Sequence, residues 1–365
     1  MDTSLSALPH SQCALVQNSV GEPVLAYDVA IPELHPNTIL VKTVAVAINP
    51  ADYKMGSRFT TPGVIIGADF AGEIVRLDAK AAELRPDLSV GDLVCGLVFG
   101  SNPAEPDNGA FAEYLRAHAA FVHKVPKHMD PKEAAALGVG LATAALSLWH
   151  ALKLPGTIEK PIAAADTPVY VLVFGASTAS GTMALQLLKL SGFTSIAICS
   201  PKNFTLVKSY GASHVFDYND ENLVEHVQRL TANKLEYALD CITDSFSVAT
   251  CYAAMARTGG RYVSLELCPA DIRPKRRAIQ HDWVFAAEVF GKSISLGQGY
   301  ERPASPELYQ FAVYWYKVFQ GLINEKKIRS HPLRVLGSGL ENIKDGIHLL
   351  KTGSISGEKL VALLK

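Results

Sequence analysis

The sequence predicts an α/β fold in two parts, a compact antiparallel barrel followed by a doubly wound parallel sheet. Up to about residue 150, short Val/Ile/Ala-rich runs such as "TILVKTVAVAINPAD" and "SVGDLVCGLVFG" are broken by Gly, Pro, Asn and Asp, a pattern typical of closely spaced barrel strands. Further on, apolar strands such as "VYVLVFG" and "SIAICS" alternate with segments of helical spacing, which indicates parallel strands joined by right-handed crossovers. A chain of 365 residues with 48% hydrophobic content also favours two domains over one.

The remaining elements follow in chain order. The stretch "MDPKEAAALGVGLATAALSLWHAL" reads as a helix that begins at Asp130-Pro131, and the Pro/Ala-rich "KLPGTIEKPIAAADTP" reads as a linker or surface insertion. The tail "HPLRVLGSGLENIKDGIHLLKTGSISGEKLVALLK" reads as strand, helix and strand that can return to complete the first domain. We therefore expect a first domain of 1–160 completed by 325–365, and a second domain of 161–324.

The composition indicates which binding partners and which cellular compartment to expect. The net charge of −1 gives no electrostatic reason to expect binding to nucleic acid or to an anionic membrane. No apolar run reaches the roughly 18 residues of a membrane-spanning helix, and the N-terminal residues lack the pattern of a signal peptide. The six cysteines are scattered without a C-x-x-C pair, which suits a reducing compartment. We expect a cytoplasmic protein.

The loop "GASTASGT" follows the first strand of the parallel sheet. It has two glycines, Gly175 and Gly181, and four hydroxyl residues stand around them. A dinucleotide diphosphate needs close backbone approach, free N–H groups and a helix N-terminus. The same composition also suits a strand–helix turn that needs small residues only for packing. The loop opens the first βαβ unit and the second strand ends roughly 20 residues later, as a dinucleotide site requires.

The end of that second strand, "CSPKN", indicates which dinucleotide binds. An Asp or Glu at this place accepts hydrogen bonds from the ribose of NAD and repels a 2′-phosphate. Ser200 and Asn203 offer neutral hydrogen bonds and Lys202 offers a positive charge instead. Lys202 on its own is also consistent with a solvated lysine at a helix start. The missing carboxylate favours NADPH.

The order of barrel, nucleotide fold and returning tail resembles the medium-chain dehydrogenase/reductase family. The motifs "VAINPADYKMG", "IIGADFAGEIV", "GDLVCG", "GAFAEYL", "LATAALSL" and "GEKLVALL" carry the resemblance over essentially the full chain. "NPADYKM", "CSPKNF", "YALDCIT", "YVSLE", "HPLRV" and "SGEKLV" are most similar to the fungal trans-acting enoyl reductases of polyketide biosynthesis, of the lovastatin-pathway type. The resemblance implies a GroES-like catalytic domain and a Rossmann cofactor domain.

The zinc ligands of this family are missing. Zinc-dependent members carry a Cys soon after the Asn of the first motif and a Gly-His-Glu in the next, where this chain has Pro50-Ala51 and Gly67-Ala68-Asp69. The loop of four closely spaced cysteines that binds structural zinc is also absent. Without Cys or His at those spacings neither tetrahedral site forms, so we expect a metal-independent reductase.

A reductase without a Lewis acid suits conjugate reduction. Hydride delivered to the β-carbon moves charge onto a thioester or ketone oxygen, and hydrogen bonds suffice to stabilise the enolate. By resemblance Lys54 contacts cofactor or substrate, with a surface lysine as the alternative. The hydroxyl of Thr143 either bonds the thioester oxygen or bonds back to its own helix. The proton donor stays open.

The resemblance also supplies two sets of contact residues. Those expected at the cofactor are Ala51, Asp52, Tyr53, Lys54, Ser177, Thr178, Ala179, Ser180, Gly181, Thr182, Met183, Ala184, Ser200, Pro201, Lys202, Asn203, Tyr218, Leu265, Glu266, Ser356 and Gly357. Those expected at the substrate are Thr143, Ala144, Ala145, Leu146, Ser147, Leu148, Trp149, His150, Ala287, Glu288, Val289, Phe290 and Gly291. Tyr218 either flanks the adenine or is a buried residue at the sheet end. Apolar packing is the alternative for the substrate set.

These observations predict an NADPH-dependent, metal-independent enoyl reductase acting on a carrier-protein-bound α,β-unsaturated polyketide intermediate. The alternatives are a quinone or alkenal reductase on free small molecules and a non-catalytic binding protein. The expected partner is the acyl-carrier protein of a polyketide synthase or of a hybrid polyketide-peptide synthase. The basic run of Arg273, Lys275, Arg276 and Arg277 either docks that acidic carrier or is a solvated loop. We expect a monomer.

Overall fold

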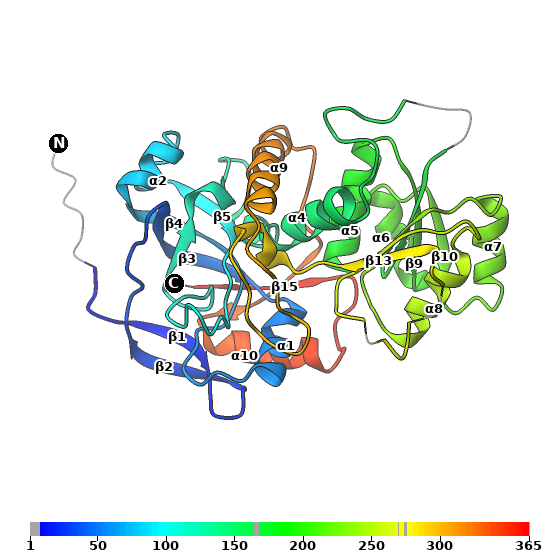
Figure 1. Ribbon diagram of the computed structural model, residues 1–365. Helices are drawn as coiled ribbons and strands as arrows, with labels where there is room; N and C mark the ends of the chain where they lie inside the picture. The colour runs from blue at the N-terminus through cyan, green and yellow to red at the C-terminus, as the bar shows by residue number, and fades with distance from the viewer. Residues whose placement is uncertain (1–7, 164–167, 269, 274–275, 365) are drawn as a thin grey trace.

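The computed structural model describes residues 8–163, 168–268, 270–273 and 276–364, which form two halves, each built on one large sheet (Figure 1). The first half combines the N-terminal part of the chain with its C-terminal strands, and the second half contains the middle of the chain. Strand β15 (Lys359–Leu363) and helix α10 (Glu341–Lys351) lie beside N-terminal elements of the first half. Lys275, from the predicted basic run, lies outside the described residues.

The first half is a seven-stranded sheet in the order β14-β15-β3-β4-β5-β7, with β6 paired to β3, and a separate β1-β2 hairpin. Its antiparallel register includes Val361 opposite Ala47, which joins the C-terminal strand to β3. The strands are β1 (Gln12–Gln17), β2 (Pro23–Val29), β3 (Thr38–Ala47), β4 (Asp69–Leu77), β5 (Leu93–Leu97), β6 (Tyr114–His118), β7 (Val122–Lys124) and β14 (Leu333–Ser338). Helices α1 (Pro50–Arg58) and α2 (Ala79–Leu84) and the 3₁₀ turn η1 (Ala119–Phe121) belong to this half.

The second half is a six-stranded parallel sheet in the order β10-β9-β8-β11-β12-β13. Counted along the chain this is the order 3-2-1-4-5-6 of a doubly wound Rossmann sheet, which reverses between β8 and β11. The strands are β8 (Tyr170–Phe174), β9 (Thr194–Cys199), β10 (His214–Asp217), β11 (Tyr237–Asp240), β12 (Gly260–Ser264) and β13 (Ile279–Trp283). The helices are α5 (Ala179–Leu190), α6 (Phe204–Ser209), α7 (Leu223–Leu230), α8 (Ser245–Ala254) and α9 (Pro306–Asn324), with 3₁₀ turns η3 (Pro201–Asn203) and η4 (Ala286–Phe290). The predicted α/β fold class is confirmed.

The helix predicted after Asp130 is divided into three pieces. They are α3 (Pro131–Ala135), α4 (Gly138–Ala145) and a π-helical turn η2 (Leu146–Ala151). A Cβ on Gly138 would stand 2.3 Å from the carbonyl oxygen of Gly96, so only glycine allows α4 to approach strand β5 this closely.

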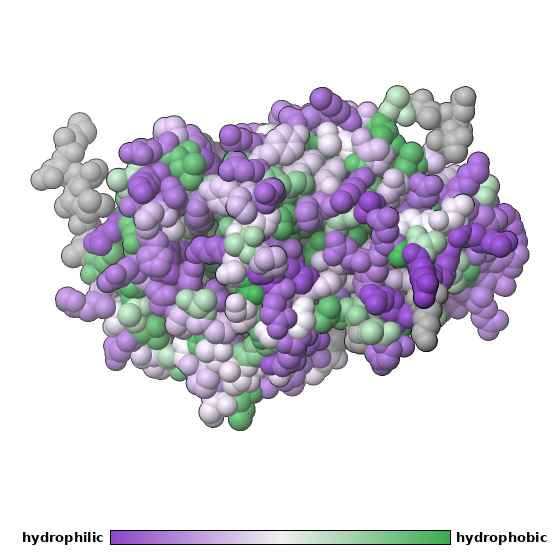
Figure 2. Space-filling view, viewed as in Figure 1, coloured by the Kyte–Doolittle hydropathy of each residue, from purple (hydrophilic) through white to green (hydrophobic). Residues whose placement is uncertain are grey.

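The same stretch bears on the expectation that no segment could span a membrane. By length and hydropathy, 131–151 is long enough to do so, although 83% of its most apolar window is buried inside the protein. This burial is what a core helix of a folded protein shows, and length and hydropathy by themselves are weak evidence for a membrane span. Over the face drawn in Figure 2, hydrophobic residues occur in small groups among hydrophilic ones.

Candidate active site

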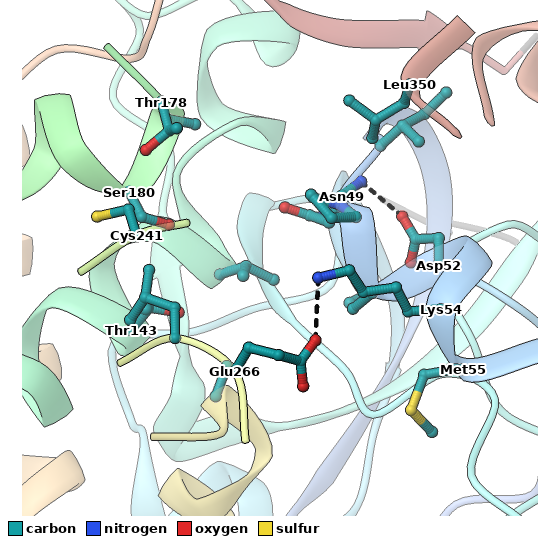
Figure 3. Close-up of a pocket in the computed structure, with 18 of the residues that line it drawn as sticks. Asn49, Asp52, Lys54, Met55, Thr143, Thr178, Ser180, Cys241, Glu266 and Leu350 are labelled. Atoms are coloured by element: carbon teal, nitrogen blue, oxygen red, sulfur yellow. Dashed lines mark hydrogen bonds and ion pairs between the residues drawn. The ribbon is translucent and has the colours of Figure 1, made fainter. Parts of the chain in front are cut away.

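A cleft of about 410 Å³ lies between the two halves and is lined by residues of both. Helix α1 and strand β15 form one wall, and the loop after β8 and the ends of β11 and β12 form the other. In an open α/β sheet, ligands bind outside the carboxyl ends of the strands where the strand order reverses. Thr178, Ser180 and Cys241 stand across this cleft from Asn49, Lys54 and Asp52 (Figure 3). The cleft is the candidate active site.

The loop between β8 and α5 has the features that a diphosphate requires. Gly175 has φ +71°, and a Cβ on Gly181 would stand 2.6 Å from the carbonyl oxygen of Gly175. The hydroxyl of Thr178 caps α5 by accepting a hydrogen bond from the N–H of Gly181 at 3.0 Å. The N–H groups of Ala179 and Ser180, in the first turn, have no partner within the helix, so they are available to an anion at the positive end of the helix. These residues fit a dinucleotide.

The end of β9 is tied to both the phosphate loop and the C-terminal segment. The side-chain amide of Asn203 donates to the hydroxyl of Ser177 at 3.1 Å and to that of Ser356 at 3.2 Å. Lys202 is exposed beside them. The structure also places Asp217, at the end of β10, in register with Cys199, so a carboxylate that sequence spacing did not reveal lies on the neighbouring strand end.

Lys54 belongs to a cluster of charged groups that crosses the cleft. Its Nζ is 2.9 Å from Oε2 of Glu266 (Figure 3), and Nη1 of Arg58 is 2.8 Å from Oε1 of the same carboxylate. The hydroxyl of Tyr300 donates to Glu266 and accepts from Arg58. Burial opposes ionisation of Glu266, but the hydrogen bond from Tyr300 and the charges on Lys54 and Arg58 outweigh it and hold its pKa below the usual value. The ionised Glu266 therefore holds the ammonium of Lys54 in place through this ion pair.

Thr143 lines the cleft from α4 and is buried, with 8% of the residue exposed. Its hydroxyl makes no hydrogen bond to any described residue, although bonding back to its own helix was the alternative that the sequence left open. A hydroxyl in this situation is free to bond a ligand in the cleft. The π-helical turn that follows α4 is a feature that is frequent at functional sites.

A buried polar network stands behind helix α1. Nζ of Lys359 donates to Oδ2 of Asp69 at 2.6 Å and to Oδ1 of Asn49 at 2.8 Å. Asp69 also accepts from the N–H of Val139 at 2.6 Å. The carboxylate of Asp52 accepts from the N–H of Asn49 at 2.6 Å, and burial raises the pKa of Asp52 to about 7 despite this bond. The network joins α1, β4, α4 and β15 at the cleft wall.

The predicted cofactor residues divide into three groups. Those that line the cleft are Ala51, Asp52, Lys54, Ser177, Thr178, Ala179, Ser180, Leu265, Glu266, Ser356 and Gly357. Those that lie at the β9 and β10 ends, outside the cleft wall, are Ser200, Pro201, Lys202, Asn203 and Tyr218, the last with 38% of the residue exposed. Tyr53, Gly181, Thr182, Met183 and Ala184 do not line the cleft, and the last two pack into the core because the helical turn of α5 points them inward.

Most of the predicted substrate residues do not line the cleft. Only Thr143 and Ala287 do so. Ala144, Ala145, Leu146, Ser147 and Leu148 are buried in the core, Trp149 stacks on Trp315 at 3.7 Å, and His150 packs against Phe311. Glu288 pairs with Arg302, Val289 and Phe290 pack against the core, and Gly291 ends the turn η4. These residues make packing contacts in the structure, and their contact with substrate stays a prediction.

The residues that sequence reasoning missed form an apolar chamber in the cleft. Its aromatic members are Phe59, Phe99, Trp283, Phe285 and Tyr300. Tyr300 makes edge-to-face contacts with Phe59 at 5.2 Å and with Trp283 at 5.1 Å. These residues come from four separate stretches of the chain without a shared motif, so no pattern in the sequence identified them. The chamber suits an apolar chain.

Comparison with known proteins agrees with this geometry. The chain matches the family described as alcohol dehydrogenase GroES-like domain over residues 35–127, and the family described as zinc-binding dehydrogenase over residues 179–293. The structure is similar to that of CurK enoyl reductase, with a TM-score of 0.72, 18% identity and coverage of 97% of this chain and 99% of that one. The two family matches, together with the fold, show that the chain belongs to the medium-chain dehydrogenase/reductase superfamily of oxidoreductases, which use a nicotinamide cofactor.

Proteins with similar sequences show which kind of oxidoreductase this chain is related to. The chain is 44% identical to trans-enoyl reductase ccsC of Aspergillus clavatus, over 97% of this chain and 96% of that protein. It is also 44% identical to trans-enoyl reductase RAP2 of Pyricularia oryzae, over 98% of this chain and 99% of that protein. The chain belongs to the trans-enoyl reductase family.

Zinc is the metal that one of the matched family descriptions implies, and the residues present do not fit it. Within residues 8–163, 168–268, 270–273 and 276–364, no three His, Cys, Asp or Glu side chains cluster as a metal site would need. Asp69, in the motif where zinc enzymes of the family have Gly-His-Glu, instead pairs with the ammonium of Lys359.

Proposed function

We propose that this protein is a trans-acting enoyl reductase that uses NADPH to reduce the α,β-double bond of a carrier-protein-bound polyketide intermediate. The observation that carries the proposal is the 44% identity to trans-enoyl reductases over 97% of this chain. The cleft supports it, since it joins a dinucleotide loop to an apolar chamber and has no set of metal ligands among the described residues. We also propose that 1–160 with 325–365 forms the catalytic domain and 161–324 the cofactor domain.

The proposed chemistry assigns roles to two cleft residues. When bound, a nicotinamide would supply the hydride for the β-carbon of the enoyl thioester, and an acid or water would supply the proton that the α-carbon takes up. We propose that the hydroxyl of Thr143 and the ammonium of Lys54, which both line the cleft, donate hydrogen bonds to the thioester oxygen as negative charge develops there. Glu266 acts through Lys54 by holding it at 2.9 Å. The apolar chamber around Phe59 and Trp283 accepts the acyl chain.

The preference for NADPH over NADH rests on the end of β9. Lys202 is exposed and makes no ion pair with a described residue, so its charge is available to a 2′-phosphate. Asp217 on the adjacent strand favours the opposite choice, but its Oδ1 already accepts from the N–H of Asn219 at 3.0 Å. We propose that the charge of Lys202 outweighs that of Asp217 and that the protein therefore binds NADPH in preference to NADH.

The partner and setting are proposed on the same basis. We expect the acyl-carrier protein of a polyketide or hybrid polyketide-peptide synthase to deliver the substrate, and a monomeric, cytoplasmic enzyme to receive it. Part of the basic run is used inside the fold, because Nη2 of Arg276 donates to the carbonyl oxygen of Ala256 at 2.7 Å and closes the end of α8. Arg273 contacts His281 on the edge strand β13 at 3.2 Å. Both contacts favour a structural role for the run over carrier docking.

Oxidation of NADPH by the purified protein tests the reaction. The substrates are enoyl-pantetheine thioesters of increasing chain length, with a free quinone and a free alkenal in parallel. We expect turnover of the thioesters, rising with chain length as the apolar chamber fills. Turnover of the quinone alongside inertness to every thioester would mean a small-molecule reductase, and inertness to all substrates despite NADPH binding would mean a binding protein.

A charge reversal tests the cofactor. Lys202→Glu should lower kcat/KM for NADPH about 10-fold or more while changing that for NADH much less, because it places a carboxylate where the 2′-phosphate binds. Lys208→Glu, on the exposed side of α6, is the matched control with the same change in net charge. Equal effects of the two variants would contradict the assignment of Lys202.

A further inference from the structure

His331 lies in the cleft wall and has no role in the function proposed above. It precedes β14, and 4% of the residue is exposed. The segment before it is fixed against the cofactor half, since the N–H of Arg329 donates to Gln186 at 2.9 Å and the hydroxyl of Tyr210 donates to the carbonyl oxygen of Ser330 at 2.5 Å. The position of the imidazole is therefore set by the fold.

The contacts around the ring are consistent with one assignment of its proton. Nδ1 of His331 is 2.9 Å from Oγ1 of Thr182, and that hydroxyl donates its proton to the carbonyl oxygen of Ala179 at 3.2 Å. We assign the ring proton to Nδ1, with Thr182 as its acceptor, because the hydroxyl proton of Thr182 then has its own acceptor in Ala179. Burial, with the charge on Lys359 adding to it, lowers the pKa of His331 to about 4, so the ring is neutral. The other nitrogen, Nε2, is a hydrogen-bond acceptor.

This acceptor has no partner among the described residues. Both ring nitrogens of His123 also lack partners, but they are sealed in the core, whereas His331 belongs to the cleft wall. A nearly buried acceptor that faces a cleft without a partner loses its bond to water when a ligand enters, unless the ligand supplies a donor. A ligand that binds in this part of the cleft is therefore expected to present an O–H or N–H donor to Nε2.

The position of the ring indicates which part of the cofactor supplies that donor. Thr182 lies in α5 just beyond the two N–H groups available to the diphosphate, and the carbonyl oxygen of Pro332 accepts from the N–H of Lys359, whose side chain reaches Asn49. His331 thus stands between the phosphate loop and the start of α1. Diphosphate oxygens are acceptors only and would be repelled by the lone pair, whereas a ribose carries hydroxyl donors.

We propose that Nε2 of His331 binds the nicotinamide-riboside half of the cofactor by accepting a hydrogen bond from a ribose hydroxyl. Thr182 is the positioning residue that holds the proton on Nδ1. The proposal rests on the nicotinamide cofactor of the proposed function, and it adds a contact beyond the cofactor residues expected from family resemblance. It does not depend on the identity of the enoyl substrate.

Equilibrium binding tests the proposal without turnover. The dissociation constants of NADPH and of adenosine 2′,5′-bisphosphate, which lacks the nicotinamide riboside, are measured for the wild type, His331→Leu and His331→Gln. We expect His331→Leu to raise the Kd of NADPH about 3- to 10-fold, the value of one hydrogen bond, and to leave the Kd of the bisphosphate within about 2-fold. His331→Gln keeps an acceptor near the position of Nε2 and should stay closer to the wild type.

The outcomes are distinct. An unchanged Kd for NADPH in His331→Leu, or an equal loss for both ligands, would overturn the contact. If His331→Leu does not fold, Thr182→Val takes its place, because it removes the acceptor that holds the ring. We expect Thr182→Val to weaken the binding of NADPH but not that of the bisphosphate. An unchanged Kd for NADPH, or the same loss of affinity for both ligands, would again overturn the contact. A wild type that binds NADPH and yet leaves every enoyl thioester unreduced would defeat the proposed function alone.

Discussion

Replacement of Lys359 by Met is expected to destabilise the protein strongly. Asp69, whose side chain is 0% exposed, would keep its hydrogen bonds from Val139 and Asn49 but lose the ammonium at 2.6 Å. Breaking a buried ion pair by removing one partner costs about 3–5 kcal/mol. Because two hydrogen bonds to Asp69 remain, we expect the lower end, about 3 kcal/mol, which corresponds to a fall in Tm of about 6–12 °C for a domain of this size.

Urea denaturation followed by circular dichroism measures this loss. Lys351→Met is the matched control, since Lys351 pairs with Glu22 at the surface, with side chains 46% and 57% exposed, and should change stability by less than about 0.5 kcal/mol. The double variant Lys359→Met/Asp69→Asn removes both buried charges and should recover about 1–3 kcal/mol. A Lys359→Met protein as stable as the Lys351→Met control, or a double variant less stable than Lys359→Met, would refute this account of the network.

Three other outcomes are expected. Because the pKa of Glu266 is held low, its contribution to stability is present near neutral pH and is lost as the pH falls through the folded-state pKa. Glu266→Gln should remove that part of the fall in urea midpoint at acid pH. Wild-type and variant curves of urea midpoint against pH that superimpose would contradict this. The pKa of Asp52 is raised to about 7, so the folded state holds a proton that the unfolded state releases, and stability should fall as the pH rises from about 4 to 7; Asp52→Asn should flatten this slope. Gly181→Val places a Cβ 2.6 Å from the carbonyl oxygen of Gly175 and should weaken NADPH binding about tenfold or more, whereas Gly321→Val, with open space around its Cβ position, should bind normally.

The sequence was informative where chemistry depends on neighbouring residues. The apolar alternation predicted the two sheets, and the glycines of "GASTASGT" stand where the backbone turns sharply between β8 and α5. It was less informative about the substrate side. Small residues after Thr143 suggested a channel; in the structure they pack α4 and the π-helical turn into the core, and their contact with substrate stays a prediction. Composition is the same in both cases, so only the direction of each side chain distinguishes them.

The sequence by itself determined the fold class, the family and the absence of the zinc ligands, because each depends on local periodicity or on residue types at fixed places in a motif. Only the tertiary structure decided which side chains meet in the cleft. Lys54 and Glu266 are 212 residues apart in the chain, and Lys359 and Asp69 are 290 apart. No local propensity couples such distant positions, since they come together only when the C-terminal strand joins the first sheet and the two halves close around the cleft.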